Sequence, residues 1–135
     1  MKKILFAALL LLSLIICFTF SGCSGGSDDI KAGIAAGKEG DFDKAIVLFT
    51  RAIESGKLSQ ENLSIAYCNR GFARRKKGDY DKAIADFTKA IEINPNDASA
   101  YQFRGYCWKF IGNDDKANAD YEKAKKLDPS IRCCH

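Results

Sequence analysis

With 135 residues, 47% of them hydrophobic and 28% charged, the chain has the composition of one modest globular domain and not of a disordered protein. The formal net charge of +4 includes Lys2 and Lys3, and residues 1–22 hold no acid, so removing them leaves 19 basic against 17 acidic residues. This near-neutral balance lacks the basic excess of nucleic-acid-binding proteins, and we expect no nucleic-acid partner. Only two prolines occur, which favours helices over a strand-and-turn architecture.

The first 22 residues have the three regions of a secretory signal. Lys2 and Lys3 give a positive start, residues 4–20 are almost wholly apolar, and two small residues precede Cys23. The ending Phe-Ser-Gly-Cys at residues 20–23 resembles the lipobox of bacterial lipoproteins, in which the cysteine is acylated and becomes the first residue after cleavage. The resemblance implies a lipid anchor at Cys23.

Two other interpretations of this segment remain open. Residues 4–20 are just long enough for an uncleaved transmembrane helix, and an ordinary signal peptidase would leave Cys23 as a free thiol. All three interpretations place residues 24–135 outside the cytoplasm, and the lipoprotein one attaches them to the cell membrane or an outer membrane. We expect residues 23–27 to form the lipidated cysteine and a short flexible tether.

A repeat runs through the rest of the chain. Residues 67–71 (Tyr-Cys-Asn-Arg-Gly) align with residues 101–105 (Tyr-Gln-Phe-Arg-Gly), 34 positions later. Residues 40–46 match residues 78–84 at an offset of 38. The 34-residue offset also relates Gly78 to Gly112, Ala83 to Ala117, Ala90 to Ala124 and Pro95 to Pro129.

Each copy of the repeat predicts two helices joined by a short turn. In the middle copy, apolar residues recur at the spacing of one helix face: Ala83, Ile84, Phe87, Ala90 and Ile91. A Gly-Asp pair precedes this helix, and Asn94-Pro95 ends it, because proline cannot donate the next backbone hydrogen bond. Small residues such as Gly71 and Gly105 allow the two helices to approach closely.

A 34-residue period with Tyr, Gly, Gly, Tyr, Ala, Phe, Ala and Pro in order resembles the tetratricopeptide repeat (TPR). The resemblance implies an all-α fold, an α-α superhelix of three TPR-like helical hairpins. A degenerate first repeat spans 26–63, the second spans 64–97, the third spans 98–131, and 132–135 form a C-terminal tail. We expect a monomer whose first repeat is the most divergent, with a frayed first helix.

The third repeat carries a polar substitution pattern. Where the second helices of the earlier repeats have Ile46 and Ile53, or Ile84 and Ile91, the third has Asn118 and Lys125. A terminal helix must face water on the side where another repeat would stack. We therefore expect the array to end with this helix.

The resemblance implies a concave surface lined by the first helix of each hairpin. The residues at the positions that line this surface are Ile65, Cys68, Phe72, Arg75 and Lys76, then Ser99, Gln102, Tyr106, Lys109 and Phe110. Such an aromatic and basic surface suits a protein or peptide partner, with apolar area buried on the rings and acidic groups paired with the cations. The alternative interpretation is a solvated face of cations beside partly buried aromatic residues.

Chaperone-binding members of the family hold a terminal carboxylate with a specific set of Lys, Asn and Arg. Asn69 occupies one matching place, but Ile30 and Ile34 stand where the first repeat needs Lys and Asn. We therefore expect no such clamp, and we interpret Asn69 as a hydrogen-bonding residue between helices.

Nothing in the sequence supports an enzyme or a cofactor. The single histidine is His135, no nucleophile motif or phosphate-binding glycine loop occurs, and we expect acids such as Asp86 to lie on turns and solvent faces. Cys107 is expected in the core. The alternative function is metal binding or thiol-redox chemistry through the terminal Cys133, Cys134 and His135, although three adjacent residues rarely complete a metal site.

Overall fold

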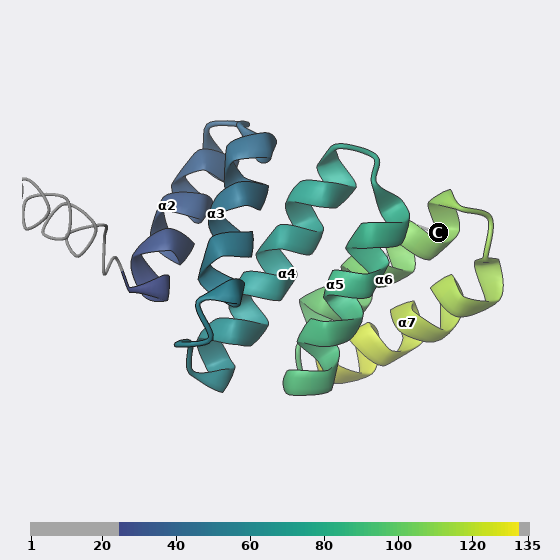
Figure 1. Cartoon of the computed structure of the whole chain (residues 1–135). Helices are drawn as coiled ribbons and strands as arrows, with labels where there is room; N and C mark the ends of the chain where they lie inside the picture. Colours follow the sequence, from purple (N-terminus) through teal and green to yellow (C-terminus); the bar gives the residue numbers. More distant parts are fainter. Residues whose placement is uncertain (1–24, 133–135) are drawn as a thin grey trace, which may run out of the picture.

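The computed structural model describes residues 25–132, and all the regular structure in that range is helical. The helices are α2 (Gly26–Lys38), α3 (Phe42–Glu54), α4 (Gln60–Lys76), α5 (Tyr80–Ile93), α6 (Ala98–Phe110) and α7 (Asp114–Leu127). Figure 1 shows them as three antiparallel hairpins stacked side by side in chain order. The predicted all-α fold of three helical hairpins is therefore confirmed. The signal segment and Cys23 lie outside the described residues.

Each hairpin turns at a glycine that occupies the equivalent position of its repeat. Gly40, Gly78 and Gly112 have φ values of 82°, 81° and 80°, a left-handed conformation that side chains disfavour. In the second hairpin, the Asp79 amide after the glycine donates to the Arg74 carbonyl, which ends α4 in a Schellman arrangement. The repeated Gly-Asp and Gly-Asn pairs thus stop one helix and begin the next within three residues.

A glycine of each first helix contacts an aromatic ring of its partner helix. An ideal Cβ built on Gly33 would lie 2.8 Å from the Phe49 ring, and one built on Gly105 would lie 2.8 Å from the Tyr121 ring. Gly71 faces Phe87 in the same way at 3.0 Å. The rings fill the hairpin interior only because these three positions lack a side chain.

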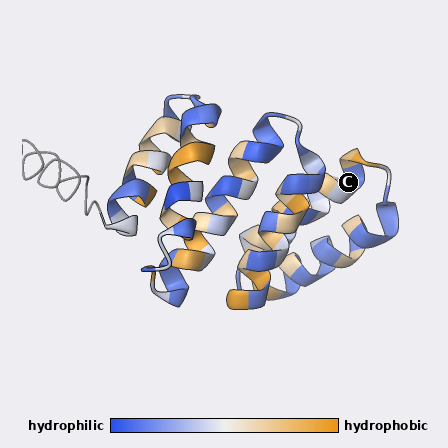
Figure 2. Cartoon of the chain, in the orientation of Figure 1, coloured by the Kyte–Doolittle hydropathy of each residue, from blue (hydrophilic) through white to orange (hydrophobic). Residues whose placement is uncertain are grey.

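The two ends of the array differ. Gly26 and Ser27 belong to α2, and Gly26 is buried against Leu58 and Ser55, so the expectation of a tether reaching residue 27 is wrong. At the other end, Asn118 and Lys125 on α7 are exposed, as expected of a capping face. Figure 2 shows α7 mostly in hydrophilic colours, unlike α3 and α5. In the described part of the chain, no helix is both long and apolar enough to cross a membrane.

Two arginines link the helices of their own hairpin through ion pairs and reach the preceding hairpin through a hydrogen bond. The Arg70 guanidinium donates to both carboxylate oxygens of Asp86 at 3.0 and 2.8 Å, and its remaining nitrogen donates to the Thr50 hydroxyl of the preceding hairpin at 3.0 Å. The equivalent set in the next repeat is Arg104 with Asp120, at 2.8 and 2.7 Å, and with Thr88 at 3.1 Å. Each bidentate pair holds the two helices of its hairpin together, and the bond to threonine connects that hairpin to the preceding one.

The expectation that Asp86 lies on a solvent face is wrong. Its side chain is 4% exposed and also accepts from Arg74 at 2.8 Å. Helical periodicity places Asp86 next to Phe87 at the edge of the apolar face, where only the arginines of α4 make burial of a carboxylate tolerable. The signal in the sequence was the matched 34-residue recurrence of both Arg and Asp.

Asp86→Ala leaves Arg70 and Arg74, whose side chains are 12% and 19% exposed, without their carboxylate. We expect a loss of about 3 kcal/mol in the free energy of unfolding, because a buried charge loses its partner. Urea unfolding followed by circular dichroism measures this change. Glu92→Gln on the exposed face of the same helix is the control and should leave the unfolding midpoint almost unchanged. Equal destabilisation by both variants would contradict the bridging role.

Candidate functional site

The first helices of the hairpins, α2, α4 and α6, pack against one another in that order and form one face of the array. The predicted lining residues come from α4 and α6. The structure brings four of them together, Phe72, Arg75, Tyr106 and Phe110, and leaves Lys76 and Lys109 exposed beside them.

Five rings beside this face form two groups that Arg75 joins, and together we call them the aromatic cluster: Phe72 and Phe103, then Tyr80, Tyr106 and Phe110. Phe72 meets Phe103 edge-on at 5.4 Å between centroids, while Phe110 lies 4.9 Å from both Tyr80 and Tyr106. Phe110 is 56% exposed, so the cluster ends in an accessible apolar surface. The sequence did not lead us to Phe103, although it follows the predicted Gln102, or to Tyr80, which begins α5 and lies outside the first helices.

Arg75 lies inside the aromatic cluster. Its Cζ atom is 4.8 Å from the centroids of Phe72 and Tyr106 and 5.2 Å from that of Phe103. Cation–π attraction of this kind holds a guanidinium flat against rings. Its Nε is buried, and no hydrogen-bond partner for it occurs among the described residues.

The other arginines of the described helices are all paired with carboxylates. Arg51 bonds Asp29, Arg70 and Arg74 bond Asp86, and Arg104 bonds Asp120. No carboxylate in residues 25–132 lies within ion-pair distance of Arg75. A partly desolvated guanidinium with free donors is a receptor for an external anion, and a carboxylate matches its planar geometry.

Cys68 and Gln102 lie apart from this group. Cys68 is half-buried and packs against the buried residues of α5 and α6, and burial, with a smaller effect of the Asp97 charge, raises the pKa of its thiol to about 12. The Gln102 amide donates to the Arg132 carbonyl at 3.1 Å, so the segment after α7 already contacts it. Neither residue contributes to the Arg75 surroundings.

Asn69 does not bond between helices as expected. Its amide donates to the Ile65 carbonyl at 2.8 Å, one turn earlier in α4. Ile30 is buried at 5% exposure, and Ile34 is half-buried. The apolar side chains at positions 30 and 34 therefore belong to the packing between α2 and its neighbours.

Cys107 is fully buried, as predicted, and burial raises the pKa of its thiol to about 11. Within residues 25–132, no group of three His, Cys, Asp or Glu side chains is arranged to hold a metal ion. Cys133, Cys134 and His135, the residues of the alternative metal or redox function, lie outside the described residues.

Two family models described as tetratricopeptide repeat match the chain, one over residues 64–97 and the other over residues 98–131. Together they span about half of it. No curated protein sequence matches the chain significantly.

Solved structures with the same fold include several TPR domains. The Arabidopsis OM64 TPR domain is 28% identical, with a TM-score of 0.75 over 81% of this chain and 87% of that one. The second TPR domain of human RPAP3, in complex with the HSP70 peptide SGPTIEEVD, is 27% identical, with a TM-score of 0.70 over 80% of this chain and 90% of that one. The UNC-45 chaperone is 32% identical, with a TM-score of 0.72 over 78% of this chain but 12% of its own.

The raised pKa values of the Cys68 and Cys107 thiols predict chemical inertness. At pH 8 the thiolate, which is the reactive form, is a fraction of about one in a thousand or less for a pKa of 11 to 12. Iodoacetamide labelling, resolved by peptide mass spectrometry, should be at least about a hundredfold slower at Cys107 in the native protein than in urea, and about a thousandfold slower at Cys68. Rapid native labelling of Cys68 would show instead that its thiol is open to the groove.

Proposed function

Because the chain belongs to the tetratricopeptide repeat family, we propose that it is a membrane-anchored scaffold that binds an extended acidic segment of a partner protein along the face of α2, α4 and α6. The family's repeat domains mediate protein–protein interaction and are generally not enzymes. The specific features proposed for this chain are the chemistry of the segment and the location outside the cytoplasm.

The observation that carries the proposal is the state of Arg75. Its guanidinium is held over three rings, and the described part of the chain offers it no carboxylate. Lys76, 5.5 Å from the Phe72 ring, and Lys109 add exposed positive charge on the same face. An acidic side chain placed on Arg75 gains charge-assisted hydrogen bonds in a site that the rings shield from water.

The accessible rings supply the remaining binding energy. A segment lying across Phe110 and Tyr106 removes apolar surface from water, at roughly 25 cal/mol per Å² buried. Aromatic and arginine residues dominate the energetics of protein interfaces for this reason. The surface therefore combines an apolar anchor with a site for negative charge.

Two solved relatives support an acidic ligand. The second TPR domain of RPAP3 is bound to the HSP90 peptide SRMEEVD in one structure and to the HSP70 peptide SGPTIEEVD in another, and both peptides end in Glu-Glu-Val-Asp. In this chain, Ile30 and Ile34 replace the Lys and Asn that a carboxylate clamp requires. Arg75, Lys76 and Lys109 take over recognition of negative charge in our proposal.

The proposed anchor is an acylated Cys23 after removal of residues 1–22. Several acyl chains on one cysteine hold a protein on a bilayer far more firmly than a single chain does. Since α2 begins at Gly26, only residues 24 and 25 separate the acylated cysteine from the folded domain. The binding face is then held close to the membrane surface, outside the cytoplasm, beside partners of the cell envelope.

A photocrosslinking amino acid tests the binding face. We expect the crosslinker at Lys109, on the proposed face, to capture a partner in intact cells, and the crosslinker at Val47, which is 63% exposed on α3, to capture none. Arg75→Gln should reduce the Lys109 crosslink at least about tenfold, because the acidic segment loses its main partner. Lys126→Gln on α7 removes the same charge elsewhere and serves as the control. Equal capture from both positions, unaffected by Arg75→Gln, would refute the proposal.

Intact mass and detergent partitioning test the anchor. The protein expressed in a bacterium should lose residues 1–22, gain the mass of acyl chains and partition with membranes. Cys23→Ala should abolish all three changes. Cys17→Ala, which alters a cysteine that leaves with the signal, should change none of them. An identical unacylated mass for wild type and Cys23→Ala would exclude the lipid anchor while leaving the repeat domain's binding role to its own test.

A further inference from the structure

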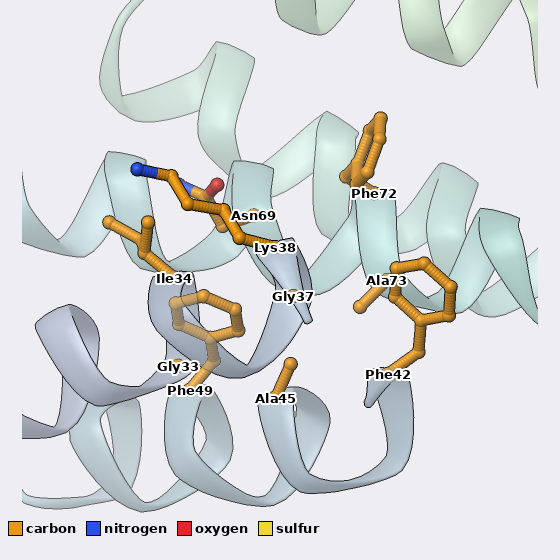
Figure 3. A pocket seen from close by; sticks show the side chains of 10 residues that line it. All are labelled: Gly33, Ile34, Gly37, Lys38, Phe42, Ala45, Phe49, Asn69, Phe72 and Ala73. Atoms are coloured by element: carbon orange, nitrogen blue, oxygen red, sulfur yellow. The ribbon is translucent and has the colours of Figure 1, made fainter. Parts of the chain in front are cut away.

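A pocket of about 340 Å³ opens between α2, α3 and α4. Figure 3 shows Ile34, Lys38 and Asn69 on one side of it, Phe42 and Phe72 on the other, and Phe49 at its base. Since a water molecule takes about 30 Å³ in the liquid, the space is ample for one large side chain. The lining is mainly apolar, and the exposed ammonium of Lys38 lies at the rim of the pocket.

The repeat explains why this pocket is open. In the register that places Gly33, Gly71 and Gly105 at equivalent positions, Gly37 corresponds to Arg75 and Lys109. The Arg75 side chain lies against Phe72, Phe103 and Tyr106, which correspond to the pocket residues Ile34, Asn69 and Phe72. The chain therefore fills the site between α4 and α6 with its own side chain, and leaves the matching site between α2 and α4 accessible.

Gly37 has no structural requirement of its own. An ideal Cβ built on it meets nothing within 4 Å, whereas a Cβ on Gly33 would collide with Phe49. Gly37 also lies within a regular helix and has no positive φ. Gly37 is the penultimate residue of α2, where neither packing nor backbone conformation requires a glycine, and its missing side chain leaves the space above it open.

We propose that this pocket receives an aromatic side chain of the partner segment. The inference rests on the proposed function and specifies its ligand. Rings of Phe42, Phe49 and Phe72 line the pocket, and aromatic pairs gain more than their buried area alone provides. The Lys38 ammonium disfavours a cationic occupant, so a guanidinium like that of Arg75 does not suit this site.

Phe72 defines the spacing of the ligand. It lines the pocket, and its centroid is 4.8 Å from the Arg75 Cζ atom, so the two binding sites share one wall. The partner segment therefore carries an aromatic residue within a few positions of an acidic one. The pairing of an aromatic with an acidic residue at this spacing distinguishes the ligand from an ordinary acidic peptide.

Gly37→Phe is designed to fill the pocket from its own wall, since a Cβ at this position meets nothing within 4 Å, and Gly37→Ala is the matched control that leaves most of the space. Both variants, with wild type and Arg75→Gln, would be purified as full-length protein in detergent and used to select from a random peptide library displayed on phage. We expect wild type and Gly37→Ala to enrich peptides with an aromatic residue near an acidic one. Circular dichroism checks that every variant is folded.

Fluorescence polarisation with the best synthetic peptide then gives the coupling. Gly37→Phe should weaken binding at least about tenfold, replacing the peptide's aromatic residue by alanine should weaken it similarly, and the two changes together should cost little more. Equal binding by wild type and Gly37→Phe, with loss only in Arg75→Gln, would overturn the pocket assignment and leave the proposed function standing. No peptide enriched on wild type would overturn both. A dimer that Gly37→Phe converts to a monomer would identify a second copy as the occupant and refute the inference.

Discussion

The close approach of helices within each hairpin is the constraint on which the structure depends. Gly33, Gly71 and Gly105 let the rings of Phe49, Phe87 and Tyr121 enter the hairpin interior. Once the rings are inside, the positions one turn further along each first helix point to the shared face of α2, α4 and α6. The contents of that face then follow from the few positions that packing leaves free.

Arginines on these first helices take two different roles because of their position in the helix. Arg70 and Arg104 directly precede the packing glycine of their helix. They reach Asp86 and Asp120 in the interior, and each also donates to a threonine of the preceding hairpin. Arg75 lies one turn beyond Gly71 and meets rings instead of a carboxylate. The first kind of arginine stabilises the array, and the second leaves its hydrogen-bonding capacity to a ligand.

The fold followed from the sequence because its period is a packing rule that each copy repeats. The site followed only in part. Phe72, Arg75, Tyr106 and Phe110 lie on helix faces that the period specifies, whereas the burial of Asp86 and the bond from Asn69 to its own helix depend on which neighbour a side chain finds. The periodicity of a sequence predicts which face of a helix is buried. How deeply a polar residue at the edge of that face is buried depends on its partners in other helices.

In our proposal, the divergence of the first repeat gives the binding face its specificity. Identical hairpins would present identical, self-filled sites between successive first helices, and a solenoid of this kind would bind nothing distinctive. Gly37 stands where the other repeats have Arg75 and Lys109, and this leaves the site between α2 and α4 open. Arg75 places a cation in the site between α4 and α6, and Phe72 lies between the two sites. The degenerate repeat keeps the shared packing, since α2 remains a full helix, and in our proposal its divergent side chains form the pocket for the ligand. A partner segment that occupies both sites must present its aromatic and acidic residues in the order of the sites along the face. This requirement selects for the direction in which the segment binds as well as for its composition.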